Sequence, residues 1–551
     1  MMRRESLHPN ILPQSKDWPI VQLNAHLEEF VKEVIHNALQ AILDSCQGDE
    51  ALREVLWCTV QQEKLRLKQR PWRIDPPDEL NFWSQVATDL TTPQNAPRVL
   101  ENIITRYVHE IVGHFTAKHF WCAEKKVTYA LSQLLCPVSL KGTLGLVDTY
   151  QRLQERIHIT GEVSQLRKLA QIGTIVMVPT HFSHLDSLVI GWVIYMLGLP
   201  PFLYGAGMNL FNSIFFARFV NNLGVYKVDR RKKNLPYLTT LKAYSCAALQ
   251  RGCHSLFYPG GTRSRSGALE PRLKLGLLGT AIEAQRRRYH TQGSKAPKIF
   301  VVPVVFNCSF VLEASFLIES YLANQGIIPG MHPLKGHPPW YKQLQLGMNV
   351  WKREGAIHVS VGNAMDLLGN VVDTSGVSYD AQGASVDTYE YFHREEASVD
   401  SISSKDEVCT KKLGEAILGA YYRCSYILAS QLVAFAAFEL MRKAYYSLSL
   451  AEFLRRSPIE TVLPYTTLSE GFAKLRAAVL QLHKASKVHI GKCLRQGSTA
   501  TMIQHGLNNL GVYHIRRPLA RNSAGDIVSQ DLSTLFYYHN RITGYGLEAY
   551  I

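Results

Sequence analysis

Apolar residues recur at spacings of three and four through most of the first 140 positions, which is the pattern of amphipathic helices. The clearest repeats cover residues 23–43 and 99–135. Between them, the proline-rich stretch at 70–79 interrupts the periodicity. We therefore predict a helical N-terminal domain at residues 1–140.

From residue 141 the pattern changes to short apolar runs, each followed by a loop and a helical segment. Buried strands that alternate with helices are typical of a mainly parallel or mixed sheet covered by helices. This predicts an α/β core at residues 141–369, with the chemistry in loops at the carboxyl ends of the strands. The runs are residues 173–179, 201–207, 254–259, 298–306 and 356–362.

Residues 370–410 differ in composition from both flanks. They are rich in Asp, Glu, Ser, Gly and Thr, and Arg394 and Lys405 are their only basic residues apart from histidine. Such a composition predicts an acidic flexible linker or insertion. Helical periodicity returns at residues 411–495, so we predict a mostly helical C-terminal region at 411–551. From about residue 508 the pattern is mixed.

Charge and cysteine usage narrow the choice of partners. The 551 residues carry a net charge of +15, which favours nucleic acid, an anionic membrane surface or phosphorylated small molecules. The ten cysteines form no CxxC pair and the N-terminus has no apolar signal segment, which favours reduced thiols on the cytosolic side. Proline, glycine or polar residues interrupt the longest apolar stretches, 187–208 and 425–441, so we expect buried helices there; monotopic membrane contact stays open.

The segment "VPTHFSHLDSL" at 178–188 includes the end of the first predicted strand. A carboxylate at Asp186 can hold one ring nitrogen of His181 and leave the other free to accept a proton, so the two are a candidate general base and its orienting acid. Two histidines and an aspartate also suggest a metal. However, the histidines are three apart and Ser187 follows the aspartate, unlike the H-x-H-x-D-H zinc hydrolases, so we expect no metal. His184 alone is more simply a cap of the next helix.

Two basic segments lie farther along the chain. "GVYKVDRRKKN" (224–234) contains Arg230 and Arg231, whose guanidinium groups suit phosphate, although a solvated surface is the ordinary alternative. "FYPGGTRSRSGALEPRLKLG" (257–276) combines glycines, hydroxyls and arginines after a strand, which favours an anion site over a generic turn, without the P-loop spacing. Its candidate residues are Gly260, Gly261, Thr262, Arg263, Ser264 and Arg265.

With "FVVPVVFNCSFVLE" (300–313), these segments resemble, in order and spacing, the glycerolipid acyltransferases with the H-x4-D motif. The resemblance covers roughly residues 145–368 and is to the glycerol-3-phosphate and dihydroxyacetone-phosphate acyltransferase branch. The matching blocks are P-x-H-x-S-H-x-D at 179–186, AG-x-NL at 206–210, LG-aromatic…RR at 223–231, the G-T-R-S-R-S-G block at 261–267 and a VPV…LE segment at 302–313.

The resemblance implies a role for each candidate. His181 would be the general base that deprotonates the substrate hydroxyl, and Asp186 would orient it. Pro303 would lie on the acyl-donor side, and no cofactor would be needed because an acyl thioester supplies the driving force. The phosphate-binding set would be Arg230, Arg231, Arg263, Ser264 and Arg265, with Gly260, Gly261 and Thr262 in a loop near the substrate.

The chain departs from the family pattern at Gly260, where these enzymes usually carry glutamate before G-T-R. Either the substrate preference has shifted, another acid such as Glu270 substitutes, or activity is reduced. Asp229, where the family tends to be apolar, is expected to neutralise part of the charge of Arg230.

We therefore expect an enzyme on the cytoplasmic face of a membrane, peripheral or monotopic, that moves a fatty acyl group from acyl-CoA or acyl-carrier protein to glycerol 3-phosphate. This reaction is the first step of phospholipid synthesis. Dihydroxyacetone phosphate and lysophosphatidate are alternative acceptors. Gly260 keeps open a non-catalytic lipid-binding protein with the same fold. Nucleic acid is not expected as a partner, because the basic residues cluster around the predicted phosphate site.

Overall fold

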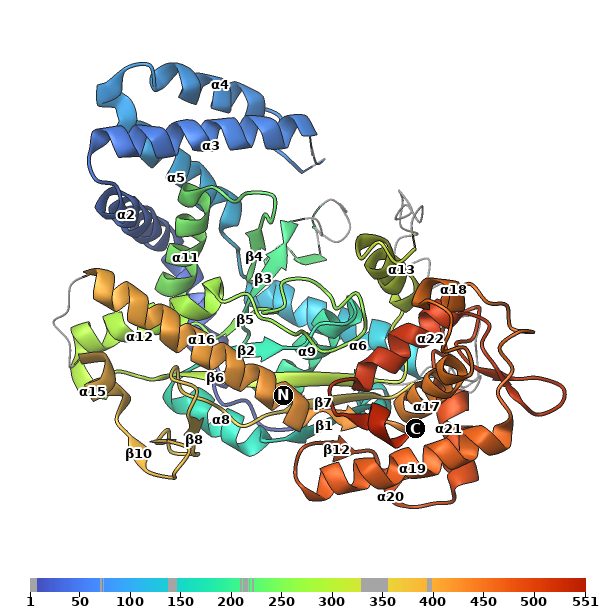
Figure 1. Cartoon of the computed structure of the whole chain (residues 1–551). Coiled ribbons are helices and arrows are strands. Elements are labelled where there is room, and N and C mark those ends of the chain that lie inside the picture. Colours follow the sequence, from blue (N-terminus) through green and yellow to red (C-terminus); the bar gives the residue numbers. More distant parts are fainter. Residues whose placement is uncertain are drawn as a thin grey trace.

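A computed structural model describes residues 7–69, 72, 74–136, 146–208, 211, 217, 219–220, 222–328, 355–393 and 399–551. Asn209 and Leu210 of the AG-x-NL block and Arg394 of the acidic segment lie outside these residues. The described parts form an N-terminal helical unit, a central sheet with helices around it, and a mostly helical C-terminal region (Figure 1).

The N-terminal helices pack through apolar stripes at helical spacing. In α2 (Leu27–Ser45), for example, Phe30, Val34, Ala38 and Ile42 are fully buried at four-residue intervals. Their core is shared with α11 (Leu235–Gln250) of the central unit, where Phe30 meets Tyr244 with ring centroids 5.2 Å apart. The other helices are α1 (Pro19–Ala25), α3 (Asp49–Gln69), α4 (Glu79–Asp89), α5 (Ala96–Ile111) and α6 (Ala117–Leu135).

The central sheet has seven strands in the order β1-β7-β6-β2-β5-β3-β4, which confirms the predicted α/β fold. The pairings are parallel except between β6 and β7, so β1 and β7 run opposite to the other five strands. The strands are β1 (Ile157–Gly161), β2 (Thr174–Pro179), β3 (Leu203–Gly207), β4 (Val225–Val228), β5 (Ser255–Leu256), β6 (Ile299–Cys308) and β7 (Ile357–Val361).

Helices α8 (Val163–Ile172), α9 (Leu185–Met196), α12 (Gly276–Gln292) and α13 (Ala314–Asn324) surround this sheet. Strands β2 and β6 are buried along their whole length, as their continuous apolar sequences predict. β5 pairs over only two residues, and the chain then enters the long loop at 257–275 that carries the glycine–arginine motif. The sheet therefore positions this loop beside the end of β2.

The acidic segment at 370–410, predicted as a flexible linker or insertion, contains regular structure instead. Strands β8 (Val371–Val372), β9 (Ser378–Tyr379) and β10 (Ser385–Val386) form an antiparallel sheet. The carboxylates at Asp373 and Asp380 each accept backbone N–H groups two and four residues ahead, so these acids stabilise turns. After α15 (Thr388–His393), helix α16 (Val399–Cys424) continues across the predicted boundary at 410 and packs beside α12 (Figure 1).

In the C-terminal region, the helices pack around α17 (Ala429–Ala444). Both apolar stretches considered above are mostly buried: α9 and β3 account for the first and α17 for the second. Among the described residues, no helix is long and apolar enough to cross a membrane. The remaining elements are α7 (Leu146–Arg156), α18 (Leu450–Leu454), α19 (Tyr465–Lys484), α20 (Lys492–Arg495), α21 (Thr499–Asn509), α22 (Leu532–His539), β11 (Tyr426–Ile427), β12 (His489–Ile490), β13 (Ala520–Arg521) and β14 (Ile527–Val528).

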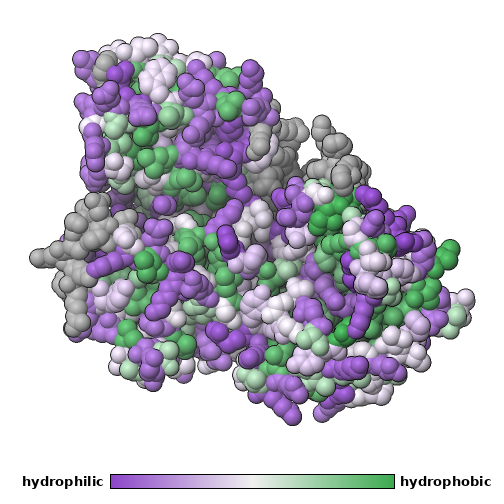
Figure 2. All heavy atoms as spheres, in the orientation of Figure 1, coloured by the Kyte–Doolittle hydropathy of each residue, from purple (hydrophilic) through white to green (hydrophobic). Residues whose placement is uncertain are grey.

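On the face shown in Figure 2, hydrophobic residues occur in small groups among hydrophilic ones, over both the N-terminal helices and the C-terminal region.

Candidate active site

The structure brings His181 and Asp186 together at the end of β2. Thr180 extends the pairing with β6 by one residue, because its N–H donates to Val304 O at 2.9 Å. His181 then leaves the sheet, and Asp186 lies in the first turn of α9. The Nδ1 atom of His181 lies 3.3 Å from Asp186 Oδ2, and the side chains are only 12% and 7% exposed. With Nδ1–H directed at the carboxylate, the lone pair of Nε2 is available to accept a proton.

Both members of this pair are held in place by further contacts. The same Asp186 oxygen accepts the backbone N–H groups of Phe182 at 2.6 Å and Ser183 at 2.8 Å. The imidazole of His181 stacks on the ring of Tyr258, with centroids 3.9 Å apart and planes inclined by 21°. Rotation of either side chain would break these contacts, so the pair is preorganised.

The glycine–arginine loop closes over this pair. The Ser264 N–H donates to the carbonyl of His181 at 2.8 Å, which links this loop directly to the segment that carries the candidate base. The Ser264 hydroxyl donates to Ala268 O at 2.7 Å and thereby helps to fold the loop itself.

Glu313, from the VPV…LE segment, joins the same motifs from the other side. Its carboxylate accepts a hydrogen bond from Arg263 Nη1 at 3.0 Å, from Ser183 Oγ at 2.7 Å and from the His184 N–H at 3.1 Å. It therefore holds the arginine of one motif against the loop that carries the candidate base.

Four cations gather beside the loop, namely Arg230, Lys233, Arg263 and Lys274. Partial desolvation and, to a smaller extent, the charge of Arg263 lower the pKa of Arg230. Desolvation and the charges of Arg230 and Lys233 lower the pKa of Lys274. A β-carbon built on Gly261 would lie 2.8 Å from Lys274 Nζ, so this ammonium group lies directly against the glycine loop. Cations that repel one another in this way form an attractive site for an anion.

Arg231 is not part of this group. It lies in a buried network with the carboxylates of Asp229 and Asp75, and its guanidinium stacks on Trp72 at 3.6 Å from the ring centroid. Asp229 thus neutralises Arg231, whereas the sequence suggested Arg230. The side chain of Arg231 is 5% exposed and connects the segment at 224–234 to the N-terminal unit.

The remaining candidates occupy different positions. Thr262 and Arg265 are exposed on the loop. Pro303 is buried within β6, opposite Val178 of β2, and its carbonyl accepts the Gly362 N–H at 2.9 Å. It lies one register position before the end of β2, so it supports the strand that leads to the candidate base.

Glu270 occupies the space that a side chain at Gly260 would need. A β-carbon built on Gly260 would lie 2.7 Å from both Cγ and Oε1 of Glu270. The Glu270 residue is 8% exposed, and neither of its carboxyl oxygens has a hydrogen-bond partner among the described residues. Burial raises the pKa of this carboxyl group to about 7, against the opposing effects of nearby backbone amides, including that of His181, and of the Arg541 charge.

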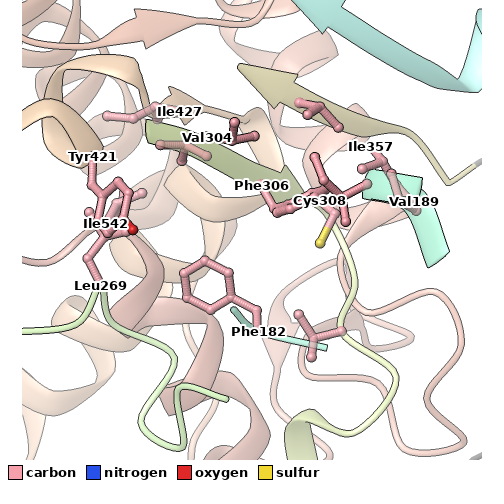
Figure 3. Close-up of a cluster of buried hydrophobic side chains, with 14 of the residues drawn as sticks. Phe182, Val189, Leu269, Val304, Phe306, Cys308, Ile357, Tyr421, Ile427 and Ile542 are labelled. Atoms are coloured by element: carbon pink, nitrogen blue, oxygen red, sulfur yellow. The ribbon is translucent and has the colours of Figure 1, made fainter. Parts of the chain in front are cut away.

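Residues near the C-terminus support these loops. The Arg541 guanidinium lies over the ring of Phe182, 3.3 Å from its centroid, and donates to Phe306 O at 3.0 Å. Asn540 Nδ2 donates to Ser266 O at 2.9 Å. Figure 3 shows the apolar part of this contact, where Phe182, Leu269 and Phe306 belong to one cluster with Tyr421 and Ile542.

Gly267 allows the same approach of the C-terminal segment. Its φ of +91° lies in the left-handed region, and a β-carbon there would lie 2.2 Å from Tyr537 O. A larger residue would push the loop away from the C-terminal segment.

The comparison with known families agrees with this geometry. Residues 160–307, about a quarter of the chain, match the model of the family described as Acyltransferase. The chain therefore carries an acyltransferase domain of the glycerolipid type, and the enzyme transfers an acyl group from a donor to a hydroxyl-bearing acceptor.

Sequence reasoning alone assigned no role to four residues of this site. Tyr258, Lys274 and Glu313 lie inside the quoted segments, but a single tyrosine, lysine or glutamate there has no evident function without the fold. Arg541 comes from the part of the chain whose pattern was mixed, and no local feature distinguishes it.

Proposed function

We propose that this protein is a glycerol-3-phosphate acyltransferase. The observation that carries the proposal is the pairing of a preorganised histidine–aspartate dyad with a cluster of cations, Arg230, Arg263 and Lys274, around the same loop. A base beside an anion site suits an acceptor that has both a hydroxyl and a phosphate.

In the proposed reaction, Nε2 of His181 takes the proton from the acceptor hydroxyl as its oxygen attacks the thioester carbonyl. Asp186 stabilises the imidazolium that forms. The tetrahedral intermediate then collapses, the carbon–sulfur bond breaks, and the protonated His181 returns the proton to the leaving thiolate. The products are the ester and a free thiol, so atoms and charge balance without a cofactor.

Glu270 bears on the non-catalytic alternative. That alternative rests on the missing glutamate at position 260, and the Glu270 carboxyl group fills the space beside this glycine. Glycine in place of glutamate at position 260 is therefore not by itself an argument for the non-catalytic alternative.

We also propose that the enzyme works at the cytoplasmic face of an anionic membrane. The net charge of +15 favours such a surface, and the acyl product is retained there.

An acceptor panel tests the proposal. Purified protein with labelled acyl-CoA, and in parallel with acyl-carrier protein, should acylate glycerol 3-phosphate faster than dihydroxyacetone phosphate or lysophosphatidate. His181→Ala should lower the rate by about 10²–10⁴-fold because the general base is lost. Transfer to lysophosphatidate alone would refute the acceptor assignment, and undiminished turnover by His181→Ala would refute the mechanism.

A further inference from the structure

A cavity of about 810 Å³ lies on the same edge of the sheet as the candidate active site. It is lined by residues at the starts of β1 and β7, including His158 and His358, and by the first residues of α17. Because β1 and β7 run opposite to β6, they begin at the edge where β2 and β6 end. Ile357 of β7 pairs with Cys308, the last residue of β6.

This topology sets the separation between the two sites. β7 and β1 are two and three strands away from β2, which leads to His181. With neighbouring strands about 4.8 Å apart, the cavity lies roughly 10–15 Å from the base along the sheet edge. An extended ligand can therefore reach both places at once.

The described wall of the cavity carries more basic than acidic side chains. Arg156, Lys492 and Arg517 line it, and Glu155 is the only carboxylate among the lining residues that the structure describes. The pKa of His158 is lowered by burial and by the charge of Arg156, which is consistent with a positive potential inside the cavity. An anionic ligand would relieve this repulsion.

The wall also offers hydrogen-bond donors. Ala429 and Ser430 are the first two residues of α17, a helix of 16 residues, and backbone N–H groups in a first turn have no partner within their helix. Ser430 lines the cavity, and its buried hydroxyl has no hydrogen-bond partner within the described part of the chain. A buried hydroxyl beside a helix N-terminus and three cations is suited to a phosphate group.

We propose that this cavity binds the phosphorylated nucleotide end of a coenzyme A thioester, the acyl donor. The inference rests on the proposed function, since it assigns the donor of the same reaction. The nucleotide phosphates would meet Lys492, Arg156 and the α17 N-terminus, and the pantetheine arm would follow the strand ends toward His181. The volume falls within the usual range of small-molecule sites, about 300–1,000 Å³.

Charge reversal at Lys492 tests the proposal, because this exposed residue can change without loss of folding. Lys492→Glu should weaken the binding of adenosine 3′,5′-bisphosphate, measured by calorimetry, by about tenfold or more, as expected for loss of a charge-assisted contact. It should raise the KM for acyl-CoA similarly and leave the KM for acyl-pantetheine, which has no phosphate, unchanged. Lys484→Glu, an exposed lysine at the end of α19, is the matched control.

Equal binding of the bisphosphate by wild type and Lys492→Glu would overturn the proposal, as would parallel rises in KM for both donors. Competition by 4′-phosphopantetheine but not by the bisphosphate would instead assign the phosphate site to a carrier-protein donor and also overturn it. His181→Ala distinguishes the two proposals, because this variant should lose turnover and keep nucleotide binding. If nucleotide binding depends on Lys492, this proposal stands even if the acceptor is not glycerol 3-phosphate.

Discussion

Exchange of the residues at positions 260 and 270 offers the sharpest test of the site, since the Glu270 side chain occupies the space that a side chain at position 260 would need. Gly260→Glu alone places a β-carbon 2.7 Å from Glu270 Cγ and Oε1, so the two side chains clash. Overpacking of this kind costs about 1–3 kcal/mol, and a second carboxylate adds like-charge repulsion. Gly260 itself has no left-handed φ, so its backbone accepts a glutamate.

Glu270→Gly should remove the carboxyl group that lies against Gly260. If that group makes a charge-assisted hydrogen bond in the transition state, its loss costs about 1.5–3 kcal/mol, or roughly 10–100-fold in kcat/KM. The double variant Gly260→Glu with Glu270→Gly returns a carboxyl group to the same space from the other position. We expect it to recover most of the activity that each single variant loses.

The assay is acyl transfer to glycerol 3-phosphate, with thermal unfolding to confirm that each variant folds. Gly276→Glu is the matched control, because a β-carbon built there meets no atom within 4 Å. The reasoning is refuted if Glu270→Gly keeps full kcat/KM, or if the folded double variant is no more active than Glu270→Gly. The cycle also yields the coupling between the two positions directly.

Three further predictions follow from the same contacts. Lys274→Ala should raise the KM for glycerol 3-phosphate about tenfold with little change in kcat, because one of the cations that would face the phosphate is lost. The exposed Lys295→Ala is the control and should leave this KM unchanged; equal effects of the two variants would contradict the role of the cation cluster. Arg231→Ala should lower the free energy of unfolding by about 3–5 kcal/mol in urea, since it leaves the buried Asp229 without its ion-pair partner and Asp75 with Arg66 alone. A large KM effect without destabilisation would instead place Arg231 at the substrate. Burial raises the pKa of Glu270 from 4.5 to about 7, so the native state binds this proton more tightly than the unfolded state. Stability should therefore fall as pH rises from about 4.5 to 7, by up to roughly 3 kcal/mol, and urea titrations of Glu270→Gln should lack this component.

The sequence predicts what is local and periodic. The apolar runs of β2 and β6 are buried on both faces and give a clear signal in the sequence, whereas β1 is a half-exposed edge strand, "IHITG", whose mixed pattern gives little signal. The composition of the acidic segment predicts a flexible linker or insertion, because it does not reveal that Asp373 and Asp380 accept backbone N–H groups in turns. A composition rich in acidic residues predicts side chains that are hydrated by water, whereas these two carboxylates accept hydrogen bonds from the backbone of their own turns.

The same distinction applies to the site. His181 and Asp186 could be paired from the sequence because five positions separate them, within reach of one strand-to-helix turn. The part played by Arg231 could not, because its partner Asp75 is 156 positions away on another unit. The adjacent Arg230 and Arg231 look equivalent in the sequence. Only the fold shows that Arg231 is enclosed by carboxylates while Arg230 lies beside the glycine–arginine loop.

The acyltransferase match ends at residue 307, yet the site depends on residues beyond it. Glu313 holds Arg263 and Ser183, and Arg541 covers Phe182 and donates to the end of β6. Tyr421 and Ile542 belong to the same buried cluster as Phe182 and Phe306 (Figure 3), so removal of the C-terminal region would expose these rings to water. Each buried aromatic side chain contributes about 1.5–3 kcal/mol, and their exposure would free the loop that carries His181. The C-terminal region is therefore a structural part of the active site. The residues that match the family model depend on the rest of the chain to hold the site in the described arrangement.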